Sequence, residues 1–325
     1  MSLSGIHAMR ILLSALLLPL ILVLGCERPP ALPEPTPLRL DSPQRRAVVL
    51  KTTTKQTIRV MSESIEQEFE EDLRYTLDID AADASGDATF QYTLDFFSLD
   101  MASDVLENAG GGMDPTTMIM RPMNEVFRAA RGLSFTGVAS PDGSVRSVDG
   151  LDDVRKEVLS RLAERTLPPE FSGTVLMEDV VNAVFDDEGT REQLSQILLE
   201  RPLEPLIEGH TWSGNTASPF GTVELPASVD FTVATVAPES ITVTEKVALL
   251  KDDASVQAFR KAIAMDSTIQ IEISGNGSGT YHIDPDSGWV NTHTRSLVLN
   301  IVFRFEGGAM TISTHVSRNL ETFRE

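Results

Sequence analysis

Apolar and polar side chains alternate along much of the chain after residue 47, with the two-residue period of a β-strand that buries one face. The clearest example is a pair of runs, residues 73–79 and 90–96, in which nearly every second residue is apolar. Residues 84–87 between them, Ala-Ser-Gly-Asp, have the composition of a turn, so the two runs are predicted to form a β-hairpin. Later strands are predicted at residues 223–236, 241–250, 269–273, 297–305 and 310–316.

Short turns separate the strands, which bears on their direction. Ser140-Pro141-Asp142-Gly143 and Pro285-Asp286-Ser287-Gly288 are typical of hairpin connections, because Gly adopts a positive φ without steric cost. Parallel strands would need crossovers of about a dozen residues or more, so an antiparallel sheet is predicted. The glycine-rich residues 275–279 are interpreted as a bend between two strands.

Residues 151–200 have a helical pattern instead. In the first segment, residues 151–165, one apolar stripe is formed by Leu151, Val154, Val158, Leu159 and Leu162. Two more helical segments follow at residues 176–185 and 190–199. A helix with one apolar stripe has to bury it, and the large apolar surface available is a sheet face.

The pattern therefore predicts an α+β fold. It is a predominantly antiparallel β-sheet with a helical segment, about residues 151–200, packed across it. The similarity of the two Pro-Asp turns leaves open two related β-rich halves, residues 47–204 with the helices and residues 205–325. The alternative is that such turns are simply common.

The N-terminal residues are typical of an export signal. Residues 11–25 form an apolar run of 15 residues, shorter than the roughly 20 that span a bilayer, and Arg10 precedes it. The run ends in Val23-Leu24-Gly25-Cys26, which resembles the bacterial lipobox. The resemblance implies cleavage between Gly25 and Cys26 and a lipid on the Cys26 thiol, giving a membrane partner through that lipid. A plain secretory signal, or an anchor with an incidental cysteine, is the alternative.

Further expectations concern the residues around this signal. Met9 is a second candidate for the start of translation, because no Lys or Arg precedes it. Glu27 follows Cys26 where Asp often marks retention at the inner membrane, which favours the outer membrane of a bacterial cell envelope. Six prolines lie between residues 27 and 46, so residues 26–46 are predicted to be the lipidated Cys and an extended tether.

Composition excludes several classes of protein. The 27 Lys+Arg and 48 Asp+Glu give a formal net charge of −21, which argues against nucleic-acid binding, since that requires clustered basic residues. The single cysteine excludes an internal disulfide framework and any cysteine-based zinc or iron–sulfur site.

Candidate chemistry in the body is sparse, and neither a catalytic residue nor a cofactor or metal site is predicted. His282 and His293 flank the second Pro-Asp turn and suggest a two-histidine site with Asp284, but polar histidines on a strand face are the favoured interpretation. Residues 62–72 hold six acids and are expected to be the solvated face of an edge strand or a turn, with a cation site as the alternative. Met118, Met120 and Met123 are expected in the core rather than in a pocket.

Several pieces together carry a family resemblance. They are the lipobox, a threonine-rich first strand, Ser140-Pro141-Asp142-Gly143, Gly209-His210-Thr211-Trp212 and Gly277-Ser278-Gly279. In this order they resemble a family of uncharacterised bacterial lipoproteins known only as a domain of unknown function. The resemblance covers about residues 47–318 and implies no activity and no functional residues.

Two classes of function remain. The first is a non-enzymatic, lipid-anchored envelope lipoprotein with a structural or ligand-binding role, whose partner is an apolar ligand or an envelope protein. The second is an envelope hydrolase with a site assembled from residues distant in sequence. A large apolar cavity would favour the first class, and converging histidines and carboxylates would favour the second.

Overall fold

A computed structural model describes residues 40, 43–60, 63–103, 115–165, 174–220, 223–250, 256, 269–305 and 308–325. The chain divides into two compact units, Met1–Glu34 and Pro35–Glu325, and every described residue belongs to the second, called the body below. Gly25 and Cys26 lie outside the described residues, as do the side chains of Met118 and Met120.

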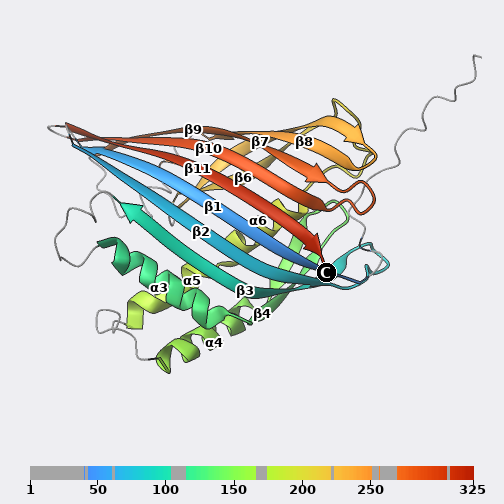
Figure 1. Ribbon diagram of the computed structural model, residues 1–325, viewed down its shortest axis with the longest axis horizontal. Coiled ribbons are helices and arrows are strands. Elements are labelled where there is room, and N and C mark those ends of the chain that lie inside the picture. The colour runs from blue at the N-terminus through green and yellow to red at the C-terminus, as the bar shows by residue number, and fades with distance from the viewer. Residues whose placement is uncertain are drawn as a thin grey trace, which may run out of the picture. The chain divides into compact units, whose positions relative to one another are not determined.

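One antiparallel sheet of eleven strands makes up most of the body (Figure 1). Its strand order is β5-β4-β3-β2-β1-β11-β10-β9-β8-β7-β6, so strands β1 and β11, from opposite ends of the chain, pair at the centre. The predicted mostly antiparallel sheet is confirmed. The strands are β1 (Gln44–Val60), β2 (Glu63–Ile79), β3 (Ala88–Ser103), β4 (Ser134–Ala139), β5 (Val145–Asp149), β6 (Thr211–Phe220), β7 (Val223–Ala237), β8 (Ser240–Leu249), β9 (Gln270–Ile283), β10 (Val290–Phe305) and β11 (Gly308–Arg324).

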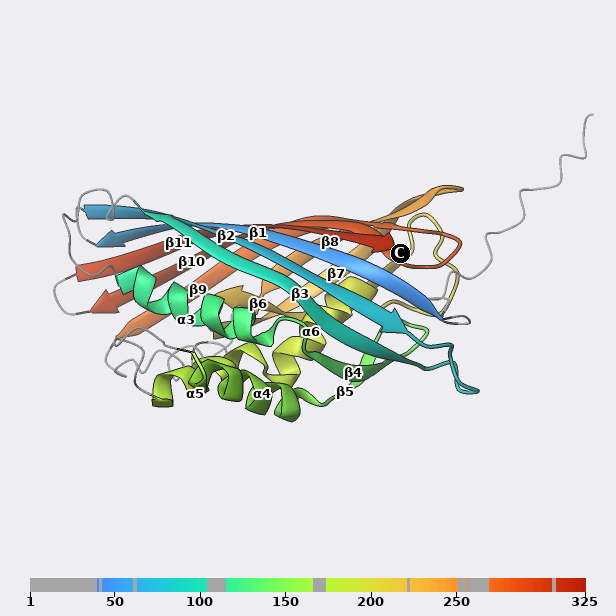
Figure 2. The same ribbon diagram turned by 60° about the horizontal axis from the view of Figure 1, so that its bottom comes forward.

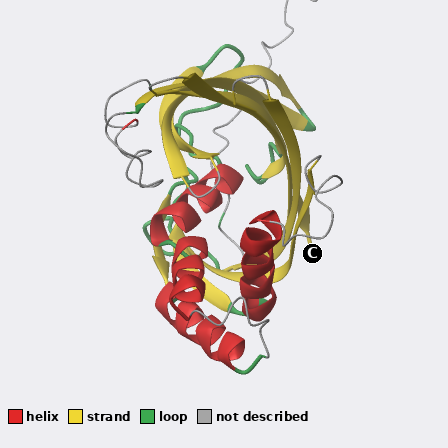
Figure 3. Cartoon of the chain, turned by 90° about the vertical axis from the view of Figure 1, so that its left-hand side faces the viewer, coloured by secondary structure: helices red, strands yellow, loops and turns green. Residues whose placement is uncertain are grey.

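The sheet curves strongly, and the helices lie on its concave side (Figure 3). Register shifts in the ladders contribute to this curvature, because an extra residue on one strand bends it. They occur between Arg74 and Tyr75 in the pairing of β2 with β3, and between Val233 and Thr235 in that of β7 with β8. The buried side chains alternate along the strands, as in Ile241, Val243, Glu245, Val247 and Leu249 of β8.

Within the described residues, four helices accompany the sheet: α3 (Pro115–Ala130), α4 (Leu151–Ala163), α5 (Thr174–Val184) and α6 (Asp187–Leu198). Figure 2 shows α3, α4 and α5 together on one side of the sheet, where they contact one another. In α4 the buried residues are Leu151, Val154, Val158 and Leu162, as predicted, whereas Leu159 is only partly buried.

Helix α6 reaches the concave face of the sheet. Its Leu194 and Leu198 lie around one small apolar space with Phe90 and Trp289 of the sheet region. At its N-terminus the Asp186 carboxylate accepts hydrogen bonds from the backbone N–H groups of Glu188 and Gly189, which satisfies donors that a helix start leaves open. Packing of the entire 151–200 segment across the sheet stays a prediction.

Three expectations need correction. The acidic residues 63–72 belong to β2, which lies between β1 and β3 and is not an edge strand. The glycine-rich residues 275–279 are part of β9, not a bend. The sheet already begins at Gln44, and the buried Leu40 accepts a hydrogen bond from Ala82 N, so the ordered body includes the end of the expected tether.

The inward-facing positions 275, 277 and 279 of β9 are glycines, because neighbouring atoms occupy the space that a side chain would need. A β-carbon on Gly275 would lie 2.7 Å from side-chain atoms of both Leu249 and Leu299. Inside a strand, glycine marks such places of close approach.

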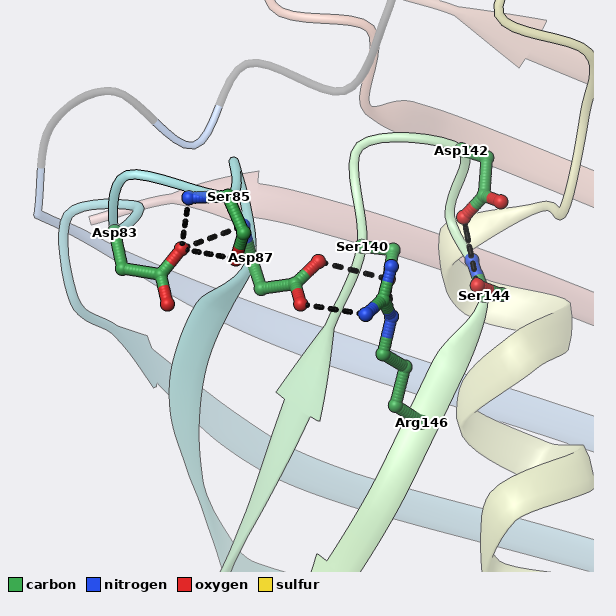
Figure 4. Close-up of polar contacts among 7 residues, drawn as sticks. All are labelled: Asp83, Ser85, Asp87, Ser140, Asp142, Ser144 and Arg146. Carbon is green, nitrogen blue, oxygen red and sulfur yellow. Dashed lines mark hydrogen bonds and ion pairs between the residues drawn. The ribbon is translucent and has the colours of Figure 1, made fainter.

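The predicted turn at residues 140–143 is present and is held by a polar network (Figure 4). Arg146 forms an ion pair of 2.9 Å with Asp87, and Ser140 Oγ donates to the same carboxylate. The Asp142 carboxylate accepts hydrogen bonds from the backbone N–H and hydroxyl of Ser144.

Arg201 joins this turn to the second Pro-Asp turn. Its backbone N–H donates to Asp142 O at 2.8 Å, and its Nη2 donates to Gly288 O at 2.6 Å. The two turns that resemble each other in sequence are therefore bridged by one residue after α6.

Candidate functional site

One row of directly paired residues carries charge across the concave face. It consists of Trp212, Phe231, Glu245, Gly279, Arg295, Arg318, Thr52 and Glu71, from eight adjacent strands. We call it the charged row. Directly paired residues point to the same side of a sheet, so these side chains share one face. That side is the concave one, because Trp212, Phe231 and Arg295 surround a cavity together with Gln196 and Leu199 at the end of α6.

Glu245 is the anionic centre of the charged row. Its carboxylate is fully buried and accepts two hydrogen bonds of 2.7 Å from Nε and Nη2 of Arg295. His293 Nε2 lies 2.9 Å from the same carboxylate. Burial alone would raise the pKa of Glu245, but the hydrogen bonds from Arg295 and His293 outweigh it and lower the pKa to about 2.

Gly279 is what allows this contact between β8 and β10. A β-carbon at Gly279 would lie 2.2 Å from Glu245 Oε1 and 2.5 Å from Thr294 O. Only a residue without a side chain leaves the path across β9 open, so the glycine and the ion pair form one arrangement.

His293 acts as a buried, neutral partner of Glu245. Its ring stacks on Tyr281 with 3.7 Å between ring centroids. Burial lowers the pKa of His293, although the Glu245 carboxylate acts in the opposite direction. A neutral ring that donates through Nε2 has an acceptor at Nδ1, and among the described residues Nδ1 has no hydrogen-bond partner.

Arg318 lies directly opposite Arg295 in the register of β10 and β11. Its Nη1 donates to the side-chain oxygen of Gln196 on α6, and within the described part of the chain it forms no ion pair. Burial lowers the pKa of Arg318; the Glu71 carboxylate opposes this and Arg295 adds to it. Burial also raises the pKa of Glu71.

A cavity of about 620 Å³ lies between the sheet and the end of α6, and we call it the larger cavity. Trp212 and Phe231 stack along its wall with centroids 5.0 Å apart, and Phe231 meets Tyr281 edge-on at 6.2 Å. Val229 and Leu199 add aliphatic surface. The polar groups of its wall include Arg295 and Gln196.

A smaller cavity of about 200 Å³ adjoins the N-terminal half of the sheet. Tyr92 and Phe135 stack along it with centroids 4.5 Å apart. Its wall also contains Glu71, Arg318 and Gln196. Gln196 therefore borders both cavities, and it contacts Arg318, which lines the smaller one.

The hypothetical two-histidine site is not formed. His282 pairs with Thr292 in the ladder, so it points to the face opposite His293; it is exposed and lies 3.4 Å from Thr242 Oγ1. Asp284 accepts hydrogen bonds within its own turn from Asp286 N and Ser287 Oγ. Across the described ranges, no group of three His, Cys, Asp or Glu side chains could hold a metal ion.

The charged row and both cavities could not be foreseen from the sequence pattern. One signal was present: Glu245 occupies a position where the alternation of β8 predicts an apolar residue. Met123 is partly buried on α3 and lines neither cavity.

The comparisons with known proteins concern the family and the fold. No curated protein matches the sequence. A structure of lipid–protein interactions in lipovitellin is similar over 88% of this chain, with 8% identity and a TM-score of 0.40, and this chain spans only 25% of the lipovitellin chain. A DUF1329 family protein from Desulfovibrio piger shows 8% identity and a TM-score of 0.13, with 87% of each chain covered. At such TM-scores neither similarity supports a conclusion.

Two further findings complete the comparison. In the part of the chain that the structure describes, no helix has the length and apolar character needed to cross a membrane. The model of a family of unknown function, DUF6263, matches residues 85–290, which is more than half of the chain. The expected resemblance to a domain of unknown function is thereby confirmed, and the chain belongs to the DUF6263 family.

Proposed function

We propose that this protein is a lipid-anchored lipoprotein of the bacterial cell envelope whose body binds an apolar or amphipathic small molecule without catalysis. The observation that carries the proposal is the larger cavity. Its volume of about 620 Å³ lies within the range of roughly 300–1,000 Å³ that is usual for ligand sites. The aromatic side chains Trp212, Phe231 and Tyr281 supply an apolar wall.

The helices have a defined part in this proposal. α6 ends beside the larger cavity. We propose that the segment 151–200 packs across the sheet and shields its concave face from solvent. Leu199 adopts a positive φ of 53° just after α6, and its carbonyl oxygen would lie 2.6 Å from a β-carbon at Gly143. This close contact with the 140–143 turn fixes the position of the cavity wall.

The alternative of a hydrolase gains no support from the site. Glu245 and His293 are both fully buried; His293 hydrogen-bonds to Glu245, and Glu245 in turn holds Arg295. A hydrolase could use a serine hydroxyl beside a histidine ring, and the described residues include such a pair: Ser296 Oγ lies 2.8 Å from His315 Nε2. Both of those residues are exposed, and neither lines the larger or the smaller cavity.

Anchoring has a direct test at Cys26. Replacing Cys26 with Ser removes the thiol that would carry the lipid, so we expect the exported protein to move from the membrane fraction to the soluble fraction. Fractionation followed by a salt wash measures this. If Cys26→Ser protein stays in washed membranes, the lipoprotein proposal is wrong.

Ligand binding can be followed through the protein's own tryptophans, since the sequence contains only Trp212 and Trp289. Trp212 lines the larger cavity, whereas Trp289 is fully buried elsewhere. We expect the neutral probe N-phenyl-1-naphthylamine to bind saturably and to quench tryptophan emission. The affinity of the probe should stay unchanged in Trp289→Phe and weaken in Trp212→Phe, because Trp212 supplies part of the cavity wall.

The matched pair of variants separates a specific site from surface adsorption. Each removes one tryptophan, but only one of the two residues borders the proposed site. Equal affinity of both variants for the probe, or no saturable binding by the parent, would contradict the proposed cavity ligand.

A further inference from the structure

We propose that the ligand of the larger cavity is an amphiphile with a single anionic headgroup, a carboxylate or a phosphate, which binds Arg318 beside Gln196, the residue that borders both cavities. This inference rests on the proposed function and adds the chemical class of its ligand. The apolar part of the ligand lies along the aromatic wall formed by Trp212, Phe231 and Tyr281.

One cation of the charged row, Arg318, forms no ion pair among the described residues. Arg295 is matched by Glu245, which accepts two hydrogen bonds from it. Arg318 faces Arg295 directly, and its hydrogen-bond partner is the neutral amide of Gln196. Glu71, on β2 two strands away from β11, lines the same smaller cavity as Arg318 and favours the charged form of Arg318, but no ion pair joins the two side chains.

Two features of this arrangement favour an anion beside Arg318. Like charges directly opposite each other on neighbouring strands repel, and a half-buried cation without an ion pair gains from an anionic partner. The burial that lowers the pKa of Arg318 has the same physical origin. An anion at Arg318 would replace the Gln196 oxygen with a charge-assisted acceptor, and a guanidinium binds carboxylate or phosphate in a two-pronged geometry.

The position of Arg318 defines how the ligand lies. Arg318 lines the smaller cavity, Arg295 lines the larger one, and Gln196 borders both. A headgroup at Arg318 is therefore next to the larger cavity once the Gln196 side chain turns aside. From there the aromatic wall continues across β9 and β7 to Trp212 on β6.

The charge of the whole protein makes cations beside the cavities important for binding an anion. A net charge of −21 repels anions at long range, so an acidic amphiphile gains no general electrostatic attraction. Selectivity for an anion over a neutral molecule of the same length must come from a specific positive group inside the body.

The test compares ligands with the same alkyl chain and different headgroups. The full chain carrying Cys26→Ser is titrated with laurate, dodecyl phosphate, dodecanol and inorganic phosphate, and each is scored by displacement of N-phenyl-1-naphthylamine. Laurate or dodecyl phosphate is expected to bind about tenfold or more tightly than dodecanol. The two acids distinguish a carboxylate from a phosphate headgroup.

Arg318→Gln should remove the preference for the acids while dodecanol binding stays unchanged, and Arg318→Lys should restore part of it. Arg304→Gln is the matched control, because Arg304 forms an exposed ion pair with Glu272 outside both cavities. Parent and Arg304→Gln proteins should show the same preference. The comparison of laurate with dodecanol on the parent needs no variant and stands even if Arg318→Gln fails to fold.

Three results would overturn the inference. They are equal affinity of the parent for laurate, dodecyl phosphate and dodecanol, an unchanged preference in folded Arg318→Gln, and inorganic phosphate binding as tightly as dodecyl phosphate. In each of these the neutral probe still binds, so the proposed function stands while its ligand class is wrong. Failure of the probe itself to bind the parent would remove both.

Discussion

Replacing Glu245 with alanine is expected to lower the free energy of unfolding of the body by about 3–5 kcal/mol. The substitution removes the carboxylate that neutralises Arg295 and accepts the hydrogen bond of His293, and both of these groups remain inside the protein. A pKa lowered from 4.5 to about 2 corresponds to about 3 kcal/mol at neutral pH, which agrees with that range. Urea unfolding followed by circular dichroism measures the loss.

The matched control is Glu272→Ala, which breaks the exposed ion pair with Arg304 and should cost less than about 1 kcal/mol. A loss in Glu245→Ala no larger than in this control would show that the buried pair does not stabilise the fold.

The same carboxylate makes stability depend on pH. The folded pKa of Glu245 is lowered, so its contribution is fully present above about pH 4.5 and is lost as the pH falls towards 2. Burial lowers the pKa of His293 as well, and this too makes acidification destabilising. Glu245→Gln should therefore lose less stability than the parent between about pH 4.5 and pH 2.

Replacing Val158 with aspartate is expected to lower the free energy of unfolding of the body by several kcal/mol. Val158 is fully buried on the apolar stripe of α4, and an aspartate there would put a charge among apolar neighbours. Thermal melting of the full chain carrying Cys26→Ser measures the result. Cooperative destabilisation of the sheet signal would mean that α4 belongs to the common core.

Leu159→Asp provides the comparison within the same helix. Leu159 is only partly buried, so an aspartate at this position keeps access to water. Leu159→Asp should therefore lower the free energy of unfolding by less than Val158→Asp does. If Val158→Asp melts like the parent, the helices form a peripheral lid, and the sheet maintains its core without them.

The strands and hairpins followed from local pattern. Residues 73–79 and 90–96 alternate because one side of each strand faces the concave interior, and the structure pairs them as β2 and β3. The turns at Gly143 and Gly288 both have positive φ, as hairpin glycines often do. The apolar stripe of α4 was likewise readable, except that Leu159 lies at its margin.

Long-range pairing could not be read from the sequence. β1 and β11 come from opposite ends of the chain, and no local signal says that they join the two parts into one sheet. Residues 275–279 were misassigned for a related reason. Glycine is ordinarily unfavourable in a strand, and here Gly275 and Gly279 are required by side chains of β8 and β10.

The candidate site was hidden because its parts are charged residues spread over distant strands. Arg295 and Arg318 look like ordinary surface residues until the register places them opposite each other on the concave face. Glu245 alone breaks the apolar alternation of its strand, which marks a position of interest without naming its partners. The histidine hypothesis failed because adjacent register positions place His282 and His293 on opposite faces.

The proposed function requires a ligand that occupies the larger cavity, and a substitution at Gly214 can fill that space. Gly214 lines the cavity on β6, and a β-carbon there would meet only Val229 and Phe231 at ordinary distances of 3.7 and 3.9 Å. A leucine at this position therefore projects into open space without a steric conflict at its β-carbon. Thr211→Leu is the matched control, since Thr211 is exposed on the same strand and does not line the cavity.

The most direct measurement is the affinity of N-phenyl-1-naphthylamine for Gly214→Leu and Thr211→Leu in the full chain carrying Cys26→Ser, read from the quenching of tryptophan emission. We expect Gly214→Leu to weaken binding about tenfold or more and to retain its melting temperature, because the leucine takes up ligand volume and loses no native contact. Thr211→Leu should bind like the parent. Unchanged affinity in a folded Gly214→Leu protein would contradict the proposal that the larger cavity is the binding site.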